Sequence, residues 1–299
     1  MKVFCTGTSG YIGGSVAAHL LAAGHQVTGL VRSQDKADAV RARGIEPVLG
    51  SLDDAEVLAQ AARAADIVVN AASADHKGAV VALLDALAGS GKPLIHTSGS
   101  SIIGTRAGGE RFDAVFDEDT PFTPSPARVA RVALNELILS YRDKGCRPVI
   151  ICPSLIYGQG LGAGPDSVQV PFLIRLAKNR GNAAHAGPGE NIWSNVHIDD
   201  LVTLYALAIE KAPAGAFYFV ENGENSMREL CVSINRMLGF AGPPSAMTMQ
   251  EAAAEWGEGT AQDTMASNSR VRAKRAWQLG WKPTACGVIK EIEQGCYRE

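Results

Sequence analysis

The stretch VFCTGTSGYIGG (residues 3–14) decides the fold of this 299-residue chain. A short apolar run meets Thr6 and is followed by three glycines, Gly7, Gly10 and Gly13. The next segment, residues 15–23, is rich in Ala and Leu and is closed by Gly24. This order predicts a strand, a tight turn and a helix, in which Gly7 permits the turn, Gly10 lets backbone approach a diphosphate and Gly13 lets helix and strand pack closely. The helix N-terminus would add free N–H groups for the phosphates. We therefore expect a dinucleotide site.

Strand and helix patterns alternate after this turn up to residue 152. Such alternation is typical of an α/β protein with a Rossmann-like, doubly wound parallel sheet covered on both faces. Asp53 with Glu56, Ser226 with Glu229, and Thr248 with Glu251 have the spacing of a capping box. The expected strands lie near residues 3–5, 26–31, 47–49, 66–70, 93–96, 149–152, 195–198 and 217–220. The expected helices lie near residues 15–23, 35–43, 78–88, 126–144, 170–179 and 200–211, with a further one after Asp53.

The alternation changes after Cys152, where residues 158–190 become rich in Gly and Pro. We expect a dinucleotide-binding Rossmann domain made of residues 1–153 and 195–220. A smaller C-terminal substrate-binding lobe would comprise residues 154–194 and 221–299. The loop at residues 158–167 has the composition of a lid over the cleft between them.

Composition and charge exclude several classes of function. A formal net charge of −3 gives no reason to expect nucleic acid or a membrane surface as a partner. The six cysteines are scattered without metal-ligand spacing, so we expect reduced thiols and no metal site. The first expected strand follows Met1 directly and leaves no room for a signal peptide, which favours a cytoplasmic protein. The expected partner is a small-molecule substrate, and a homodimer stays open.

Several further segments carry a resemblance to one family. They are NAAS (residues 70–73), HTSGSSIIG (96–104), PSLIYGQG (153–160), VHIDD (196–200) and LGWKP (279–283). In this order, and together with TGTSGYIGG, they resemble the extended short-chain dehydrogenase/reductases, also called NAD-dependent epimerase/dehydratases. The likeness extends over nearly the whole chain, and several ordered motifs are more specific than any one of them.

The resemblance implies which residues contact the cofactor. They are Gly7, Ser9, Gly10, Tyr11, Ile12, Gly13, Arg32, Ser33, Ser51, Leu52, Ala71, Ala72, Ser73, Thr97 and Pro153. Arg32 stands where an NAD-preferring site usually has an acid, and a guanidinium there suits a 2′-phosphate. Asp35, three residues on, remains an alternative for an NAD ribose. We expect NADP, with NAD as the second choice.

The family's catalytic Tyr-x-x-x-Lys pair is absent, because no tyrosine has a lysine four residues later. Matching the expected helix through Glu136 puts Arg128 at the tyrosine position and Val132 at the lysine position. Gly99 takes the usual Ser/Thr position, between Ser98 and Ser100. An arginine stabilises negative charge but is no proton donor at working pH. The candidate catalytic residues are Ser98, Ser100, Arg128 and Tyr157, the last as an alternative acid.

Trp193, Ser194 and Asn195 precede an expected strand and are candidates to line the substrate cleft. His96 and His197 fit structural roles better than catalytic ones. Two functions follow as hypotheses. The first is an NADP(H)-dependent oxidoreductase or epimerase-like enzyme that acts on a small carbonyl or hydroxyl substrate with a rearranged active site. The second is a non-catalytic NAD(P)-binding redox sensor or scaffold. An ordinary sugar-nucleotide epimerase is disfavoured by the missing pair.

Overall fold

Seven parallel strands form the central sheet of the computed structural model, which describes residues 1–298. They are β1 (Lys2–Thr6), β2 (Gln26–Val31), β3 (Glu46–Leu49), β4 (Ile67–Asn70), β5 (Pro93–Thr97), β7 (Arg147–Pro153) and β11 (Ala216–Val220). Their order across the sheet is β11-β7-β5-β4-β1-β2-β3. The chain moves outward from β1 to β3 and then returns to β4 on the other side of β1. The predicted doubly wound sheet is confirmed, and its switch point lies between β1 and β4.

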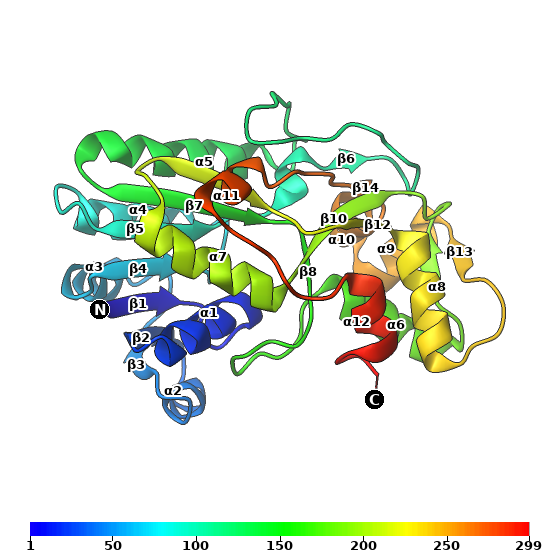
Figure 1. The fold of residues 1–299 in the computed structure, drawn as a ribbon, viewed down its shortest axis with the longest axis horizontal. Helices are drawn as coiled ribbons and strands as arrows, with labels where there is room; N and C mark the ends of the chain where they lie inside the picture. The colour runs from blue at the N-terminus through cyan, green and yellow to red at the C-terminus, as the bar shows by residue number, and fades with distance from the viewer. Residues whose placement is uncertain (299) are drawn as a thin grey trace.

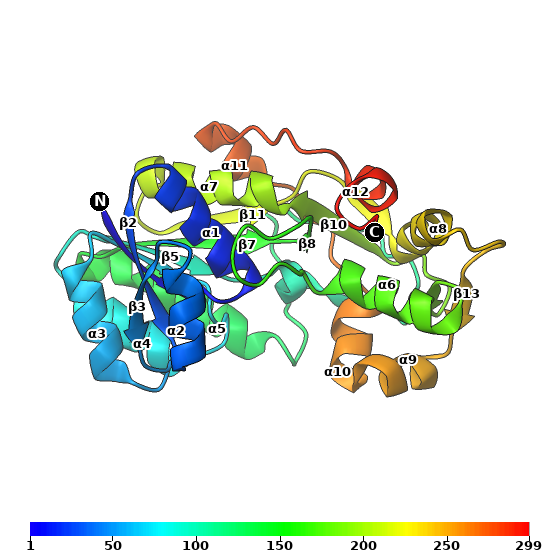
Figure 2. The ribbon, with the colours of Figure 1, turned by 90° about the horizontal axis from the view of Figure 1, so that it is seen from below.

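Helices cover both faces of this sheet (Figures 1 and 2). They are α1 (Tyr11–Ala22), α2 (Gln34–Arg41), α3 (Ala55–Ala64), α4 (Lys77–Leu87), α5 (Val129–Ser140), α7 (Ile198–Lys211) and α11 (Lys274–Leu279), with the short turns η1 (Ser100–Ile103) and η2 (Tyr141–Lys144). One apolar core lies under α1, α2, α7 and α11, and a second lies under α3, α4 and α5. Because both faces are buried, the inner strands are apolar almost throughout, as in Ile67–Asn70 and Arg147–Pro153.

A small-sheet region lies beside the large sheet along the long axis of the molecule (Figure 1). Its three-stranded sheet has the order β12-β10-β8, and two strand pairs, β13 with β9 and β14 with β6, accompany it. The strands are β6 (Thr105–Arg106), β8 (Leu155–Tyr157), β9 (Ala184–Ala186), β10 (Ile192–His197), β12 (Glu224–Ser226), β13 (Ser245–Met247) and β14 (Ser267–Asn268). The helices are α6 (Gln169–Arg180), α8 (Met227–Leu238), α9 (Met249–Trp256), α10 (Glu258–Thr260), η3 (Ala261–Met265) and α12 (Val288–Gln294).

Most predicted elements are present, and two of the three predicted capping boxes are confirmed. Ser226 and Thr248 each accept a bond from the backbone N–H of the glutamate three residues on, and each glutamate bonds back. The box at Asp53 is wrong, because α3 begins after Asp54, whose carboxylate instead accepts the N–H of Ser51 at 2.6 Å. The predicted helix at 126–144 begins later, at Val129, and ends in η2.

The predicted domain boundaries stay a prediction, but the structure adds contacts across them. β6 comes from the predicted Rossmann segment, yet it pairs with β14 of the small-sheet region. Residues 195–197 of β10 pair with β8 rather than with the large sheet. No helix within residues 1–298 is long and apolar enough to cross a membrane.

Candidate functional site

A cavity of about 710 Å³ opens at the carboxyl ends of β1, β2 and β4, beside the switch point of the sheet. This is the place where doubly wound folds bind ligands. The lining residues are Gly7, Ser9, Gly10, Tyr11, Ile12, Gly13, Leu30, Val31, Arg32, Lys36, Ser51, Leu52, Asp53, Ala71, Ala72, His76, Ser154, Ile156, Asp166, Ser167, Val168 and Gln169. Eleven of them were predicted as cofactor contacts, and the glycine-rich turn forms the floor.

The three glycines of the turn differ in their surroundings. Gly7 has φ +79°, a conformation that favours glycine. A Cβ at Gly13 would lie 2.5 Å from the carbonyl oxygen of Gly7, so this glycine allows α1 to approach β1. A Cβ at Gly10 would meet only the oxygen of Gly7, at 3.3 Å, and its other side faces the cavity. Because Gly10 precedes the first turn of α1, bare backbone and helix N–H groups meet the cavity, which fits a dinucleotide diphosphate.

The end of the cavity beside β2 carries two cations. Arg32 follows β2 directly, and Lys36 lies in the first turn of α2; both line the cavity. Ser33 does not line it and instead caps α2 by accepting the N–H of Lys36. Asp35, the alternative for a ribose, does not line it either. The sequence analysis did not name Lys36. Its position four residues after Arg32, in the helix that follows β2, could have indicated it.

Three other predicted cofactor contacts lie off the cavity. Thr97 is buried, and its hydroxyl bonds to the hydroxyl of Tyr205 on α7 at 2.6 Å, so its side chain belongs to the core and does not line the cavity. Pro153 is the last residue of β7, and the following Ser154 lines the cavity in its place. The hydroxyl of Ser73 accepts the N–H of Asp75 at 3.2 Å.

The loop at residues 158–168 closes one side of the cavity. A Cβ at Gly162 would lie 2.5 Å from the Cα of Gly14, and one at Gly164 would lie 2.9 Å from the carbonyl carbon of Gly10. The hydroxyl of Tyr11 donates to the carbonyl of Gly158 at 2.8 Å. The loop is therefore packed on the start of α1, backbone against backbone, and it brings Asp166 and Ser167 into the cavity wall.

Helix α5 presents polar side chains to the segment after β5. The Asn135 amide donates to the hydroxyl of Ser98 at 3.0 Å. Arg131 donates to the hydroxyl of Ser101 at 3.2 Å and to the carboxylate of Asp75 at 2.7 Å, and a Cβ at Gly99 would lie 3.4 Å from this guanidinium. The Arg131 bonds hold the pKa of the Asp75 carboxyl below its ordinary value. The pair Arg131-x-x-x-Asn135 thus faces the Ser98–Ser101 segment, and sequence matching through Glu136 missed it.

Arg128 lies at the N-terminus of α5, one turn before Arg131. Its side chain is half-buried, and its Nε is shielded from solvent with no hydrogen-bond partner. Burial and the nearby Arg131 lower the pKa of Arg128. Val132, at the predicted lysine position, instead packs against the apolar core under α3, α4 and α5.

Two of the candidate catalytic side chains are used in packing. Ser100 is buried, and its hydroxyl pairs with that of Ser269 at 2.7 Å, so it ties η1 to the segment after β14. Tyr157 is fully buried, with its hydroxyl donating to the carbonyl of Cys286 at 2.7 Å. Burial also raises the pKa of Tyr157. Because both hydroxyls are engaged in contacts between distant segments, neither is proposed as a proton donor.

Trp193, Ser194 and Asn195 do not precede a strand but belong to β10, which begins at Ile192. All three are buried: Trp193 donates to the carbonyl of Ser267 at 2.7 Å, and Ser194 donates to that of Val271 at 3.1 Å. Asn195 donates to Asn225 at 3.2 Å. The prediction that they line a cleft is not supported, because segment 267–271 covers Trp193 and Ser194 and Asn195 is bonded to Asn225.

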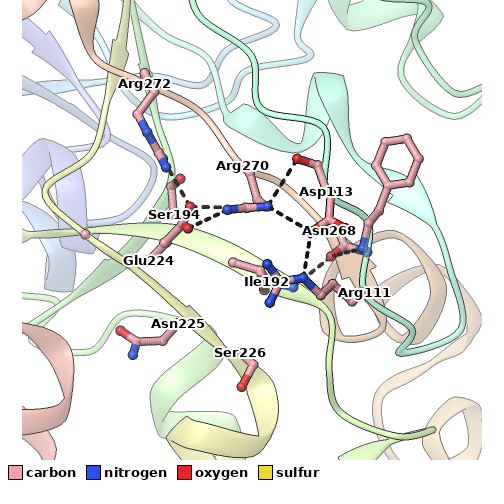
Figure 3. Close-up of polar contacts among 12 residues, drawn as sticks. Arg111, Asp113, Ile192, Ser194, Glu224, Asn225, Ser226, Asn268, Arg270 and Arg272 are labelled. Carbon is pink, nitrogen blue, oxygen red and sulfur yellow. Dashed lines mark hydrogen bonds and ion pairs between the residues drawn. The ribbon is translucent and has the colours of Figure 1, made fainter.

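Arg270 anchors that covering segment (Figure 3). Its guanidinium forms two bonds to the carboxylate of Glu224 on β12, at 2.6 and 3.1 Å, and one to the carbonyl of Asp113 at 3.2 Å. The Arg270 bonds lower the pKa of Glu224. The cluster joins segments more than a hundred residues apart, which explains why sequence reasoning took the neighbouring β10 residues for cleft residues.

His96 ends in a structural role, as predicted. It is fully buried, and its Nδ1 lies 3.0 Å from the amide nitrogen of Asn70. The amide oxygen of Asn70 accepts the hydroxyl of Thr6 at 2.6 Å. Burial lowers the pKa of His96 to about 4, so the ring is neutral near pH 7.

Comparison with known proteins identifies the family of this chain. Residues 3–220 match the NAD dependent epimerase/dehydratase family. The chain belongs to this family. It stands among the NAD(P)-dependent oxidoreductases and epimerases of the extended short-chain dehydrogenase/reductase type, as the resemblance predicted.

Two curated proteins and one solved structure illustrate the similarity. The oxidase ucsJ of an Acremonium species is 33% identical over 342 residues, covering 98% of this chain and 95% of that protein. A ketoreductase of Stigmatella aurantiaca that acts on a farnesyl-dihydroquinoline oxide is 28% identical over 240 residues, covering 75% of this chain and 69% of that protein. The structure of the dTDP-glucose 4,6-dehydratase DesIV of Streptomyces venezuelae, with NAD bound, superposes with a TM-score of 0.78 at 20% identity, covering 99% of this chain and 95% of that one.

Proposed function

We propose that this family member is an NADP(H)-dependent oxidoreductase that acts on a small carbonyl or hydroxyl substrate through a rearranged active site. The observation that carries the cofactor preference is the presence of both Arg32 and Lys36 at one end of the cavity. Two cations there favour a 2′-phosphate over a bare ribose diol, which an acid would bind. The names oxidase and ketoreductase among the relatives support redox chemistry over epimerisation.

The bound dinucleotide would supply or accept the hydride. The chain's own residues then hold and polarise the substrate. Arg128, one turn before the Asp75-paired Arg131 on α5, would stabilise negative charge on a substrate oxygen. The Ser98 hydroxyl is fixed by Asn135 beside them and is the remaining candidate of the predicted set for handling a proton. Arginine itself holds its proton at working pH and takes no part as an acid.

The cofactor preference is tested by calorimetric titration with NADPH and NADH. We expect NADPH to bind more tightly to the wild type. Arg32→Ala and Lys36→Ala should each weaken NADPH binding by about 10-fold or more, since a charge-assisted bond contributes about 1.5–3 kcal/mol, while NADH binding changes little. Arg41→Ala is the matched control, because Arg41 lies on the same helix, is exposed and pairs with Asp38. Equal affinity of the wild type for both cofactors would contradict the proposal.

A non-catalytic sensor or scaffold is the second candidate, favoured by the loss of the Tyr-x-x-x-Lys pair. The two are separated by following NADPH absorbance with a panel of carbonyl compounds. Oxidation of NADPH by any of them supports the enzyme. Tight NADPH binding without turnover of any compound supports the sensor.

A further inference from the structure

Three arginines gather where α5 meets the small-sheet region, and two of them are fully paired. Arg106 on β6 forms two bonds to Asp263, at 2.6 and 3.0 Å. Arg131 donates hydrogen bonds to both carboxylate oxygens of Asp75. Arg128 interacts electrostatically with all four of these side chains. Within residues 1–298, however, its guanidinium has no hydrogen bond and no ion pair of its own.

An unpaired, half-buried guanidinium is costly. A charged donor that leaves water without finding a partner loses its hydration energy and gains no compensating interaction. Buried charges are therefore normally paired. Both neighbouring carboxylates are already held by their own arginines, so neither is free to turn to Arg128. A group that pairs with this guanidinium would have to come from outside the chain, and a negatively charged group would suit it best.

The position of Arg128 relates that group to the reaction segment. Residues 128, 131 and 135 share one face of α5 at helical spacing. Arg131 and Asn135 from this face bond to Ser101 and Ser98, on either side of Gly99. An anion bound by Arg128 would thus lie about one helical turn from Arg131, toward the N-terminus of α5, and close to the Ser98–Ser101 segment.

We propose that Arg128 binds a carboxylate of the substrate, so that the substrate class is a small oxo acid or the corresponding hydroxy acid. The planar guanidinium matches a planar carboxylate through two parallel bonds. This inference rests on the proposed oxidoreductase function and names its substrate class.

The test compares oxo acids with their methyl esters, which differ only in the charge. Calorimetry measures the binding of 2-, 3- and 4-oxopentanoate and of each ester, with and without NADPH. For at least one acid, we expect the wild type to bind it at least 10-fold more tightly than its ester. Arg128→Ala should abolish that difference, and Arg128→Lys should restore only part of it, because a point charge cannot form both bonds.

Arg142→Ala is the control, since Arg142 is an exposed arginine just beyond the same helix and should leave the preference unchanged. Thermal unfolding of each variant checks the fold. Acid and ester binding alike in the wild type for every pair, or a preference that survives Arg128→Ala, would overturn the proposal. NADPH affinity, measured in the same variants, reports separately on the proposed function: its absence would contradict that function, whereas a carboxylate preference seen without cofactor would still support Arg128.

Discussion

At the scale of single residues, backbone demands were predictable and side-chain directions were not. Gly7 and Gly13 have the backbone roles that their spacing implied, a turn with positive φ and close packing of helix on strand, whereas the role of Gly10 toward a diphosphate stays a prediction. The directions of Ser100 and Tyr157 depend instead on Ser269 and Cys286, which are more than a hundred residues away in sequence. A short motif contains no information about such partners, so both side chains were taken for catalytic groups.

The glycines provide a matched pair of substitutions. Gly10→Val should fold normally and lose cofactor binding by at least about 100-fold, because its added methyl groups enter the cavity while its backbone, with φ −100°, suits any residue. Gly13→Val should instead lower the free energy of unfolding by about 1–3 kcal/mol or more, since its Cβ would overlap the Gly7 carbonyl. Thermal unfolding and NADPH titration measure both effects. If Gly10→Val still binds the cofactor, the glycine is needed only for the turn.

At the scale of elements, the strands and helices followed from local patterns, and their ends depended on distant contacts. β2 has the predicted bounds, Gln26–Val31, because alternating turn and apolar signals mark both ends. β10 begins three residues earlier than predicted, at Ile192, because residues 192–194 pair with β12 and Trp193 also bridges to Ser269. Apolarity alone did not indicate that Ser194 and Asn195 would be buried.

The hydrogen-bonded chain Thr6–Asn70–His96 links the ends of β1, β4 and β5 and predicts a pH dependence. The pKa of His96 falls from 6.5 to about 4 on folding. Between these values the unfolded chain binds a proton that the folded chain does not, so stability decreases as the pH falls. Between pH 7 and pH 5 the loss from this residue is about 2 kcal/mol. Urea unfolding at pH 7 and at pH 5 should therefore show a loss of unfolding free energy that is about 2 kcal/mol smaller for His96→Gln than for the wild type. Equal losses in the two proteins would show that His96 is not buried as a neutral ring.

At the scale of the whole molecule, a lid over the cavity was predicted from the glycines of residues 158–167, and the structure defines what it touches. Leu161 donates its N–H to the hydroxyl of Ser15 on α1 at 3.0 Å. Tyr297, near the other end of the chain, accepts the N–H of Gly158 at 2.9 Å. The composition of the loop suggested a lid, but only the fold brings α1 and the C-terminal segment to it.

The close packing of this loop predicts slow release of the cofactor. Gly162→Ala would place a methyl group against the backbone of Gly14 and push the loop off α1. We expect the rate constant for NADPH dissociation to rise about 10-fold, with a smaller change in association, because lids act mainly on release. Stopped-flow displacement measures both. Gly259→Ala, a position with open space around it, is the control. An unchanged dissociation rate in Gly162→Ala would mean that the loop does not hold the cofactor.

The last strand of the large sheet has a consequence for how the protein is made. β11 pairs with β7 across the full register from Ala216 to Val220, yet some sixty residues of other structure separate the two strands in the chain. During synthesis, β7 is therefore complete before β11 exists. One edge of β7 then carries unpaired backbone groups, and the inner part of this strand is apolar. Such edges invite pairing between chains. The edge of β7 stays unpaired until residue 220 has emerged from the ribosome. A cofactor-binding fragment that ends at residue 153 would therefore keep this edge of the sheet unpaired.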